Sequence, residues 1–439
     1  MSREARDGDM PWKARKTLPS PRKKIRLVRV AASILLAPWI GRVERAVLSF
    51  QHEMGCGAAG RAAPRPSFFW VLVNRFPKDY SLAFAMGLPS NFWKREMSTE
   101  ENPVWIGFDL GGTKMMAVVF DTEFRILARK RRKSRGSEGS DSGIDRIEST
   151  IRRALDEAGK GTAKIAGIGI GCPGPVNPVT GGMYTALNLG WDDVLIGPEL
   201  ARRFSAPVCV LNDVDAGLYG EYRLGAARDA QCAVGIFPGT GVGGGCVYHG
   251  EIFQGSRITC MEIGHTRITS SARSSGFELP GTLEAESSRL TIAAEAAKAA
   301  LRGDAPYLLK NCGTDIADIR SGVLAEAIKN GDRIIKDLVV DAMETVGLAV
   351  VNLVHLLAPD KVILGGGVVE ALEELVLTTV RKTAKTHVLE AYRETFEIFP
   401  AQLGDDATAT GAATWTQKKV CSANSSLPAV GVSFPPNLA

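Results

Sequence analysis

Short apolar runs separated by polar, glycine-containing segments dominate the chain from residue 104 onward. Apolar runs that end at Gly, Pro, Asn or Asp predict buried strands, and they lie at residues 104–109, 115–120, 165–171, 208–211, 232–237, 361–364 and 396–399. Apolar residues spaced three or four apart predict amphipathic helices, and they lie at residues 144–158, 215–222 and 407–415 and through most of 283–357. Strands interleaved with helices in this way predict an α/β fold.

The longest helical stretch also predicts part of the core. Its apolar positions fall on one helical face and are expected to be buried; they are Leu338, Met343, Val346, Val350, Leu353 and Leu357. His355 lies on the same helix and is interpreted as a packed side chain without a chemical role. By contrast, residues 177–191 contain two adjacent glycines and an Asn-Leu-Gly-Trp segment, and they predict a loop.

Composition changes this picture at the two ends of the chain. The 439 residues are 45% apolar, enough for two or three domains with sizeable cores. Residues 1–96 carry 18 Lys and Arg against 7 Asp and Glu, which leaves 35 against 41 in the rest. We interpret residues 1–96 as a basic extension, disordered or outside the native body, although a nucleic-acid-binding arm has the same composition. Residues 416–439, rich in Ser, Pro and Asn, predict a disordered tail.

The cysteines and an early apolar run indicate the compartment. The eight cysteines form no Cys-x-x-Cys pair and several lie inside apolar runs, which is typical of reduced thiols in the cytoplasm. Residues 30–40 are apolar, but Pro38 interrupts them, they are too short to span a bilayer, and no convincing signal-peptide cleavage site follows. We therefore expect a cytoplasmic protein without a membrane partner.

Three glycine turns follow apolar strands and are candidates to hold phosphate groups. The first, Gly-Gly-Thr-Lys at 111–114, joins two strands in a hairpin. Its backbone N–H groups and hydroxyl suit an anion, and Asp109 before it is placed to hold Mg²⁺ through water. The second turn lies at 239–245 and the third at 365–367. One such turn is also typical of an ordinary glycine hairpin, but three in this arrangement form a more specific pattern.

A carboxylate at the end of the strand at 208–211 is a candidate general base. A sugar hydroxyl is a poor nucleophile until a carboxylate accepts its proton, so Asp213 at this position indicates phosphoryl transfer to a polar small molecule. The competing interpretation is that Asp213 caps the helix predicted at 215–222. Glu262 and His265 follow farther along the chain, either as substrate-binding groups or as a surface salt pair.

In this order the motifs resemble those of the ROK family (repressor, open reading frame, kinase) over residues 104–415. The matching segments are Asp-Leu-Gly-Gly-Thr-Lys at 109–114, Leu-Asn-Asp-Val-Asp-Ala at 211–216, Gly-Thr-Gly-Val-Gly-Gly-Gly at 239–245, Glu-Ile-Gly-His at 262–265, Leu-Glu at 283–284 and Gly-Gly-Gly at 365–367. The resemblance implies the two-lobed fold of actin and hexokinase-like ATPases, with duplicated ribonuclease H-like domains and an active-site cleft between the lobes. We expect an N-terminal lobe at 97–212 and a C-terminal lobe at 213–415, with the last helix returning to the first lobe.

The resemblance also implies an activity and the residues that perform it. It implies a glucokinase-like enzyme that uses ATP and Mg²⁺ to phosphorylate a hexose, at the 6-hydroxyl of glucose by default, and it suggests a homodimer. Asp213 is implied as the catalytic base, and the implied sugar-binding side chains are Asn212, Glu262, His265 and Glu284. The residues implied for the nucleotide and its phosphates are Asp109, Gly111, Gly112, Thr113, Lys114, Gly239, Thr240, Gly241, Gly243, Gly365, Gly366 and Gly367.

The chain departs from the family at one place. Members commonly carry a Cys-x-Cys-Gly-x-x-Gly-Cys segment before the Leu-Glu pair, and its cysteines bind a structural zinc together with the histidine. The corresponding positions here are Ser275, Phe277 and Thr282. Hydroxyl groups and a phenyl ring cannot replace thiolates, so we expect no structural zinc, and His265 is left to bind the sugar.

Several other functions stay open at this point. On the same fold, polyphosphate can replace ATP as the donor, or an N-acetylhexosamine can replace the hexose. A sugar-responsive transcriptional regulator of the family needs a helix-turn-helix before the body, and prolines interrupt every candidate window for one; they are Pro64, Pro66, Pro77 and Pro89. We therefore expect no nucleic-acid partner. A sugar-binding module without catalysis is the third class.

Overall fold

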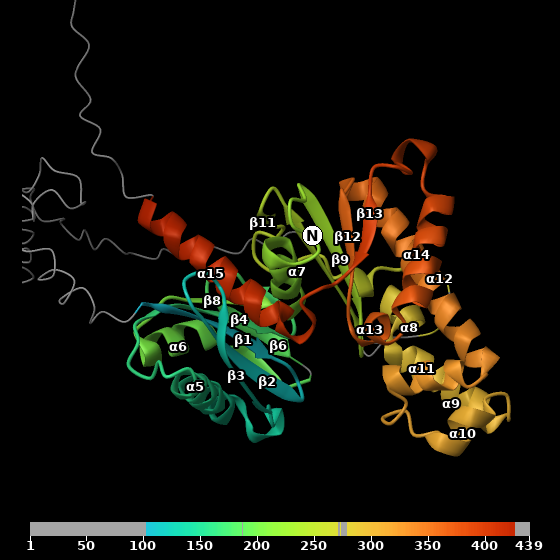
Figure 1. Ribbon diagram of the computed structural model, residues 1–439, viewed down its shortest axis with the longest axis horizontal. Helices are drawn as coiled ribbons and strands as arrows, with labels where there is room; N and C mark the ends of the chain where they lie inside the picture. The colour runs from blue at the N-terminus through green and yellow to red at the C-terminus, as the bar shows by residue number, and fades with distance from the viewer. Residues whose placement is uncertain (1–101, 187, 271–272, 274–278, 426–439) are drawn as a thin grey trace, which may run out of the picture. The chain divides into compact units, whose positions relative to one another are not determined.

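Residues 102–425, except 187, 271–272 and 274–278, are described by a computed structural model, in which two α/β lobes follow one another along the chain (Figure 1). The first lobe is built on a five-stranded sheet of order β3-β2-β1-β4-β8. β1 pairs antiparallel with β2 and parallel with β4, so the predicted hairpin is confirmed. The strands are β1 (Val104–Leu110), β2 (Lys114–Phe120), β3 (Ile126–Lys133), β4 (Ile165–Cys172) and β8 (Val208–Asn212).

Different helices cover the two faces of this sheet. Alternate residues of β1 point to opposite faces. Ile106 packs with α5 (Ser140–Glu157) and α6 (Ile196–Phe204). Trp105, on the other face, packs with α15 (Ala407–Ser425), the last described element of the chain. The end of the chain therefore completes the core of the first lobe.

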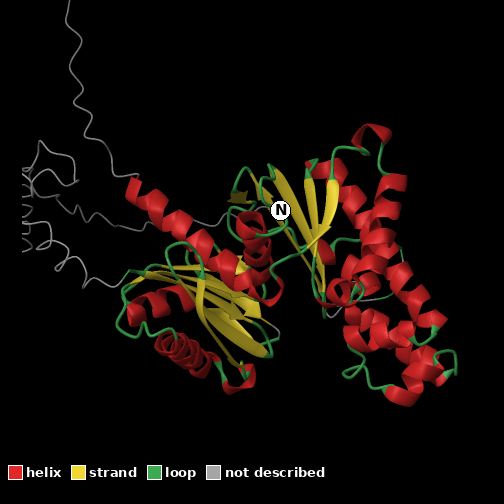
Figure 2. Ribbon diagram, in the orientation of Figure 1, coloured by secondary structure: helices red, strands yellow, loops and turns green. Residues whose placement is uncertain are grey.

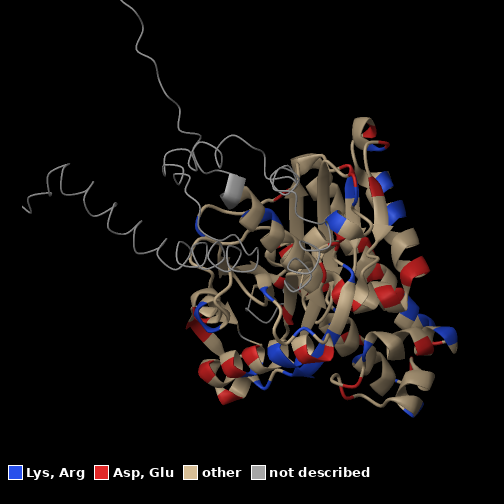
Figure 3. Cartoon of the chain, turned by 60° about the vertical axis from the view of Figure 1, so that its left-hand side comes forward, with Lys and Arg blue, Asp and Glu red and all other residues tan. Residues whose placement is uncertain are grey.

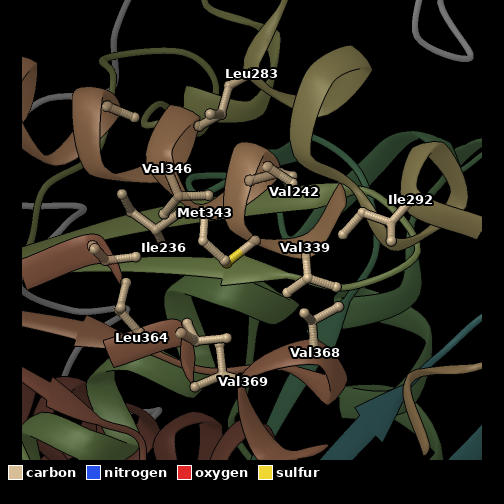
Figure 4. Packing of buried hydrophobic residues seen from close by; sticks show 14 of the residues in the cluster. Ile236, Val242, Leu283, Ile292, Val339, Met343, Val346, Leu364, Val368 and Val369 are labelled. Carbon is tan, nitrogen blue, oxygen red and sulfur yellow. The ribbon is translucent and has the colours of Figure 1, made fainter. Parts of the chain in front are cut away.

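The second lobe is built on a sheet of order β11-β10-β9-β12-β13. α7 (Asp213–Leu224) packs on one face, and α12 (Arg333–Leu357) packs on the other, where Figure 4 shows Met343 and Val346 beside Ile236. The strands are β9 (Cys232–Pro238), β10 (Val242–Tyr248), β11 (Glu251–Ile252), β12 (Lys361–Leu364) and β13 (Glu397–Pro400).

The predicted helical stretch at 283–357 is confirmed, and it forms most of the helical side of the second lobe (Figure 2). Four of the six predicted core positions on α12 are buried, while Leu338 and Leu357 are partly buried. Apart from α12, the helices of this lobe are α8 (Leu283–Ser287), α9 (Arg289–Leu301), α10 (Pro306–Asn311), α11 (Ser321–Lys329), α13 (Gly367–Ala371) and α14 (Glu373–His387). Single 3-10 turns complete the described chain at Gly136–Glu138, Ile263–His265, Glu390–Tyr392 and Gly404–Asp406.

The loop predicted at 177–191 is wrong in part, because a small antiparallel sheet forms there. Its strands are β5 (Val176–Asn177), β6 (Gly182–Ala186) and β7 (Trp191–Val194). Met183 and Trp191 are buried, and the Trp191 ring donates to the carbonyl of Gly136 at 3.1 Å. The strands are too short to show an alternation of apolar and polar residues, so the prediction of a loop depended on the glycines.

The last helix was predicted to end at Trp415, but it continues to Ser425. The polar residues that suggested a tail have partners in the fold. Lys419 pairs with Glu251 at 3.3 Å, and its ammonium lies 4.2 Å from the centre of the Trp415 ring. Residues 1–96 and 426–439, predicted as an extension and a tail, lie outside the described residues.

The surface of the described part carries both signs of charge. Figure 3 shows Lys and Arg interspersed with Asp and Glu over the helices. None of the helices within the described ranges combines the length and the apolar character needed to cross a bilayer.

Candidate functional site

The junction between β8 and α7 fixes the position of Asp213. Asn212 is the N-cap of α7, and its side-chain oxygen accepts from the backbone N–H groups of Val214 at 2.8 Å and Asp215 at 3.2 Å. The amide group of Asn212 also donates to the carbonyl of Gly174 at 3.3 Å. The capping role therefore belongs to Asn212, and Asp213 is the first residue of the helix. The alternative that Asp213 is itself the cap is wrong.

The surroundings of Asp213 suit a proton acceptor. Its side chain is half-buried, and its Oδ1 accepts from the N–H of Val214 at 2.9 Å. Burial raises the pKa of Asp213 to about 6, and the neighbouring charge of Glu262 adds to the rise, although the backbone donor at Val214 lowers it. A carboxylate with this pKa is ionised near neutral pH and remains basic enough to accept a proton.

Asp109, the last residue but one of β1, interacts electrostatically with Asp213. Burial first, and then the charges of Asp213 and Asp405, raise the pKa of Asp109 to about 7, although Arg131 acts to lower it. Arg131 is itself paired with Asp405 at 2.7 Å. Asp109 therefore lines a charged hollow between the first sheet and the start of the last helix; its other lining residues are Lys114, Met115, Met116, Arg131 and Asp405.

The turn at 111–114 has the hairpin geometry that the sequence predicted. The N–H of Gly111 donates to the carbonyl of Lys114 at 2.9 Å, and the N–H of Ser134 donates to the carbonyl of Thr113 at 2.9 Å. The side chains of Thr113 and Lys114 are exposed. The turn thus keeps a hydroxyl and an ammonium group accessible beside Asp109.

The second glycine segment is a hairpin rather than a continuous loop. Only its first part turns, where the N–H of Gly239 donates to the carbonyl of Gly241 at 2.8 Å. Gly243 and the two glycines after it lie inside strand β10. A Cβ atom at Gly243 would lie 2.5 Å from a methyl group of Val214, so the absence of a side chain lets the first turn of α7 approach the strand. The prediction of a loop at 239–245 is therefore corrected to a turn followed by a strand.

The predicted sugar-binding acids form one electrostatic group around the start of α7. Desolvation raises the pKa of Glu262, although its side chain remains accessible to solvent; the charge of His265 lowers this pKa and that of Glu284 raises it. Glu284 also accepts from the N–H of Val242 at 3.0 Å, which fixes the end of the turn at 239–241. The structure therefore brings Asp213, His265 and Glu284 each within electrostatic range of Glu262.

The third glycine turn lies against the second. Gly366 has a φ of 90°, a conformation that favours glycine. A Cβ atom on Gly366 would lie 2.7 Å from the carbonyl oxygen of Pro238, and one on Gly367 would lie 3.3 Å from the hydroxyl of Ser321. The turns at 239–241 and 365–367 thus meet at the ends of β9 and β12, which are adjacent parallel strands.

The zinc position of the family and the Mg²⁺ position near Asp109 differ in the ligands that this chain offers. Thr282, one of the positions that replace zinc ligands, accepts from the N–H of Ala285 at 3.2 Å and caps α8. Ser275 and Phe277 lie outside the described residues. Among the residues that are described, no group of three or more His, Cys, Asp or Glu side chains is arranged to hold a metal ion. Mg²⁺ needs fewer protein ligands, because it usually binds through one or two carboxylates together with water and substrate phosphates, and Asp109 near Asp405 fits that requirement.

The sequence did not single out every residue near this site. Asp215 is 1% exposed, and neither of its carboxylate oxygens has a hydrogen-bond partner within the described structure. Its pKa lies well above the ordinary value because of burial and the charges of Glu262 and Asp213. Asp405, in the 3-10 turn before the last helix, was not singled out either. The signal for Asp215 was its position two residues after Asp213 in the same motif.

Known proteins share this combination of fold and motifs. The model of the ROK family matches residues 105–419. The glucokinase of Thermotoga maritima is 29% identical over 320 residues, which cover 72% of this chain and 98% of that protein. The structure of a ROK family glucokinase from Streptomyces griseus in complex with glucose and AMPPNP is similar with a TM-score of 0.62 and 28% identity, over 72% of this chain and 99% of that one. The xylose repressor of Caldicellulosiruptor bescii is 24% identical over 306 residues, which cover 70% of this chain and 76% of that protein.

Proposed function

Because the chain belongs to the ROK family and is a sugar kinase, we propose that it transfers the γ-phosphate of ATP to a hydroxyl group of a hexose, with glucose as the first candidate and its 6-hydroxyl as the acceptor. The observation that carries this proposal is the carboxylate of Asp213. It stands at the end of β8, its helix is capped by Asn212, and its pKa is raised to about 6. Glu262 and Asp109 interact electrostatically with it.

In the proposed reaction, Asp213 accepts the proton of the sugar hydroxyl as that oxygen attacks the γ-phosphorus. The bond between the γ-phosphorus and the bridging oxygen breaks, and ADP leaves with the bond electrons. Glu262, His265 and Glu284 would orient the sugar through its other hydroxyl groups. An unmatched buried polar group costs about 1–3 kcal/mol, so such side chains also discriminate between sugars.

The glycine turns at 111–114 and 239–241 are proposed to hold the phosphates, and the turn at 365–367 is proposed to contact the nucleoside. Backbone N–H groups in such turns stabilise negative charge that develops on a phosphoryl group. Asp109 would hold Mg²⁺, which neutralises charge on the phosphates when it is bound. Lys114, exposed beside Asp109, would add a positive charge on the same side.

Two further features are compatible with this assignment. The cysteines at positions 172, 209, 232, 246, 260 and 312 are free thiols, which suits the reducing cytoplasm that we propose as the compartment. Lys and Arg are interspersed with Asp and Glu on the described surface (Figure 3), whereas nucleic-acid-binding surfaces concentrate basic side chains on one face.

A coupled kinase assay over a panel of hexoses and N-acetylhexosamines, run with ATP and separately with polyphosphate, tests the proposal. We expect turnover with ATP and at least one hexose. Turnover with polyphosphate alone, or with an N-acetylhexosamine alone, would replace the proposed donor or acceptor. Sequence-specific DNA binding without turnover, or sugar binding without nucleotide hydrolysis, would overturn the kinase assignment for this chain.

A further inference from the structure

Arg289, the first residue of α9, contacts the second glycine turn at several atoms. Its backbone N–H donates to the carbonyl of Gly239 at 2.9 Å. Its guanidinium donates to the hydroxyl of Thr240 at 3.3 Å and to the carbonyl of Ile319 at 3.4 Å. The side chain therefore lies between the proposed phosphate turn and the segment that leads into α11.

A second guanidinium approaches Arg289 from that segment. The pKa of Arg289 is lowered by burial first and then by the charge of Arg320. Within the described part of the chain, neither arginine forms an ion pair with an acidic side chain, whereas Arg302, the residue that follows α9, pairs with Asp304 at 3.1 Å. Two neighbouring cations without a carboxylate partner repel one another, and an anion bound between them would relieve that repulsion.

The contacts of Arg289 leave most of its binding capacity unused. A guanidinium has five N–H donors, and the two hydrogen bonds above are long for a charged donor, which normally binds an oxygen at about 2.7–2.9 Å. Thr240 and Arg320 are exposed, and Arg289 is only half-buried. A ligand can therefore reach the pair from solvent on the side of Thr240.

We propose that Arg289 and Arg320 form a binding site for the phosphate chain of the donor, beside the turn at 239–241. This inference rests on the proposed function, because it assumes that the donor carries phosphates linked through anhydride bonds. ATP and inorganic polyphosphate share that chemistry. Ser321, next to Arg320, lies near Gly367 in the turn proposed for the nucleoside, so a nucleotide there would extend its phosphates toward the two arginines.

Binding of tripolyphosphate, measured by isothermal titration calorimetry, tests the site without relying on turnover. We compare the full chain with Arg289→Ala, Arg320→Ala and, as a control at the other end of α9, Arg302→Ala. A charge-assisted hydrogen bond contributes about 1.5–3 kcal/mol, so each of the first two variants should weaken tripolyphosphate binding about tenfold or more, whereas Arg302→Ala should leave it unchanged. The KM for ATP should rise in parallel, with the KM for the sugar unaffected.

Two variants, Arg289→Lys and Arg320→Ala, separate binding from a structural effect on the turn. Arg289→Lys keeps the charge and should retain part of the affinity. Arg320→Ala removes a side chain that makes no described hydrogen bond, so it tests the site even if Arg289→Ala does not fold. Unchanged tripolyphosphate affinity and ATP KM in Arg320→Ala would overturn the proposal, as would unchanged values in a folded Arg289→Ala.

The outcome for the site and the outcome for the kinase assignment can be told apart. If the wild-type chain phosphorylates a sugar but the arginine variants bind tripolyphosphate normally, the site is wrong and the function stands. If the arginine variants lose tripolyphosphate binding while the wild-type chain phosphorylates no sugar, the site stands and the function is wrong. If ATP and polyphosphate share the site, they compete for the same arginines. If the arginine variants lose affinity for only one of the two donors, that donor uses the site.

Discussion

At the scale of single residues, the site is organised by carboxyl groups that are removed from water close to one another. Asp109, Asp213 and Asp215 all have raised pKa values, with burial as the largest cause in each case. They differ in their hydrogen bonds: Asp213 accepts from a backbone N–H, while Asp215 has no partner within the described structure. These differences lead to separate predictions for each residue.

Asp213→Asn tests the proposed base. The amide keeps the shape of the side chain but cannot accept the hydroxyl proton, so kcat should fall by about 10²- to 10⁴-fold. The Kd for the sugar, measured by calorimetry, should change little. Asp337→Asn, which alters an exposed carboxyl group on α12, serves as the control. A near-normal rate of glucose phosphorylation in Asp213→Asn would show that another group is the base.

The pH dependence of kcat/KM for the sugar follows from the same carboxyl groups. A raised pKa keeps an acid protonated to higher pH, so activity should be low below pH 6 and should rise as the pH passes the values of about 6 for Asp213 and about 7 for Asp109. Since the two groups interact, the apparent pKa values belong to the pair. Asp109→Asn removes a neighbouring negative charge and should move the rise of the remaining activity to lower pH. A profile that is flat from pH 5 to 8 would contradict the role of Asp213.

Asp215→Asn should stabilise the protein, and increasingly so at higher pH. The folded-state pKa of Asp215 is raised, so wild-type stability decreases as the pH rises from the unfolded value of about 3.9 through the folded value. We expect a gain of about 1–3 kcal/mol in the free energy of unfolding at pH 8, vanishing near pH 4.

Urea unfolding at several pH values measures this change. The matched control is Asp332→Asn. Asp332 is also buried, but its carboxylate accepts from the N–H groups of Tyr307 at 3.1 Å and Leu308 at 2.8 Å. That substitution should destabilise the fold. Equal effects of the two substitutions would show that Asp215 has a partner after all.

At the scale of elements, close packing between helices sets the position of Asp213, the proposed base. α7 carries Asp213 and packs against α15, where the two helices approach at a glycine. A Cβ atom on Gly411 of α15 would lie 1.7 Å from the carbonyl oxygen of Ala216. A side-chain movement could not relieve this clash, because the carbonyl oxygen of Ala216 belongs to the backbone.

Gly411→Ala should therefore destabilise the fold by about 1–3 kcal/mol or more and lower kcat, because α7 must move. Gly322→Ala on α11 is the control, since a Cβ atom there meets nothing within 4 Å, and alanine favours a helix by about 0.5–1 kcal/mol. Thermal unfolding and the kinase assay measure both variants. If Gly411→Ala were as stable and active as Gly322→Ala, the contact would be looser than the structure indicates.

The same elements explain what the sequence could and could not predict. Strands such as 104–109 and 361–364 are buried apolar runs with clear ends, so their prediction needed no tertiary information. Gly243 was read as part of a loop because its role depends on Val214, a neighbour from another element. Arg289 gave no signal, since its proximity to Thr240 and Arg320 arises only when α9 and the segment before α11 meet the turn.

At the scale of the whole molecule, the family match begins at residue 105, and the first strand begins at Val104. A variant that starts at Met97 should therefore keep the kcat of the full chain and its midpoint of urea unfolding. kcat and the midpoint of urea unfolding are measured on both purified proteins and compared. A loss of solubility or a lowered midpoint on truncation would show that the first 96 residues contribute to the stability of the body.

The placement of α15 has a consequence for how the protein is made. The first sheet is synthesised early, but Trp105, Met116 and Val118 on one of its faces pack with Ala409 and Ala413 of the last described helix. While the ribosome still holds that helix in its exit tunnel, the nascent chain exposes this apolar face. Completion of the first lobe therefore has to wait until α15 has left the ribosome, and in that interval the uncovered face is a target for chaperones that bind apolar surface.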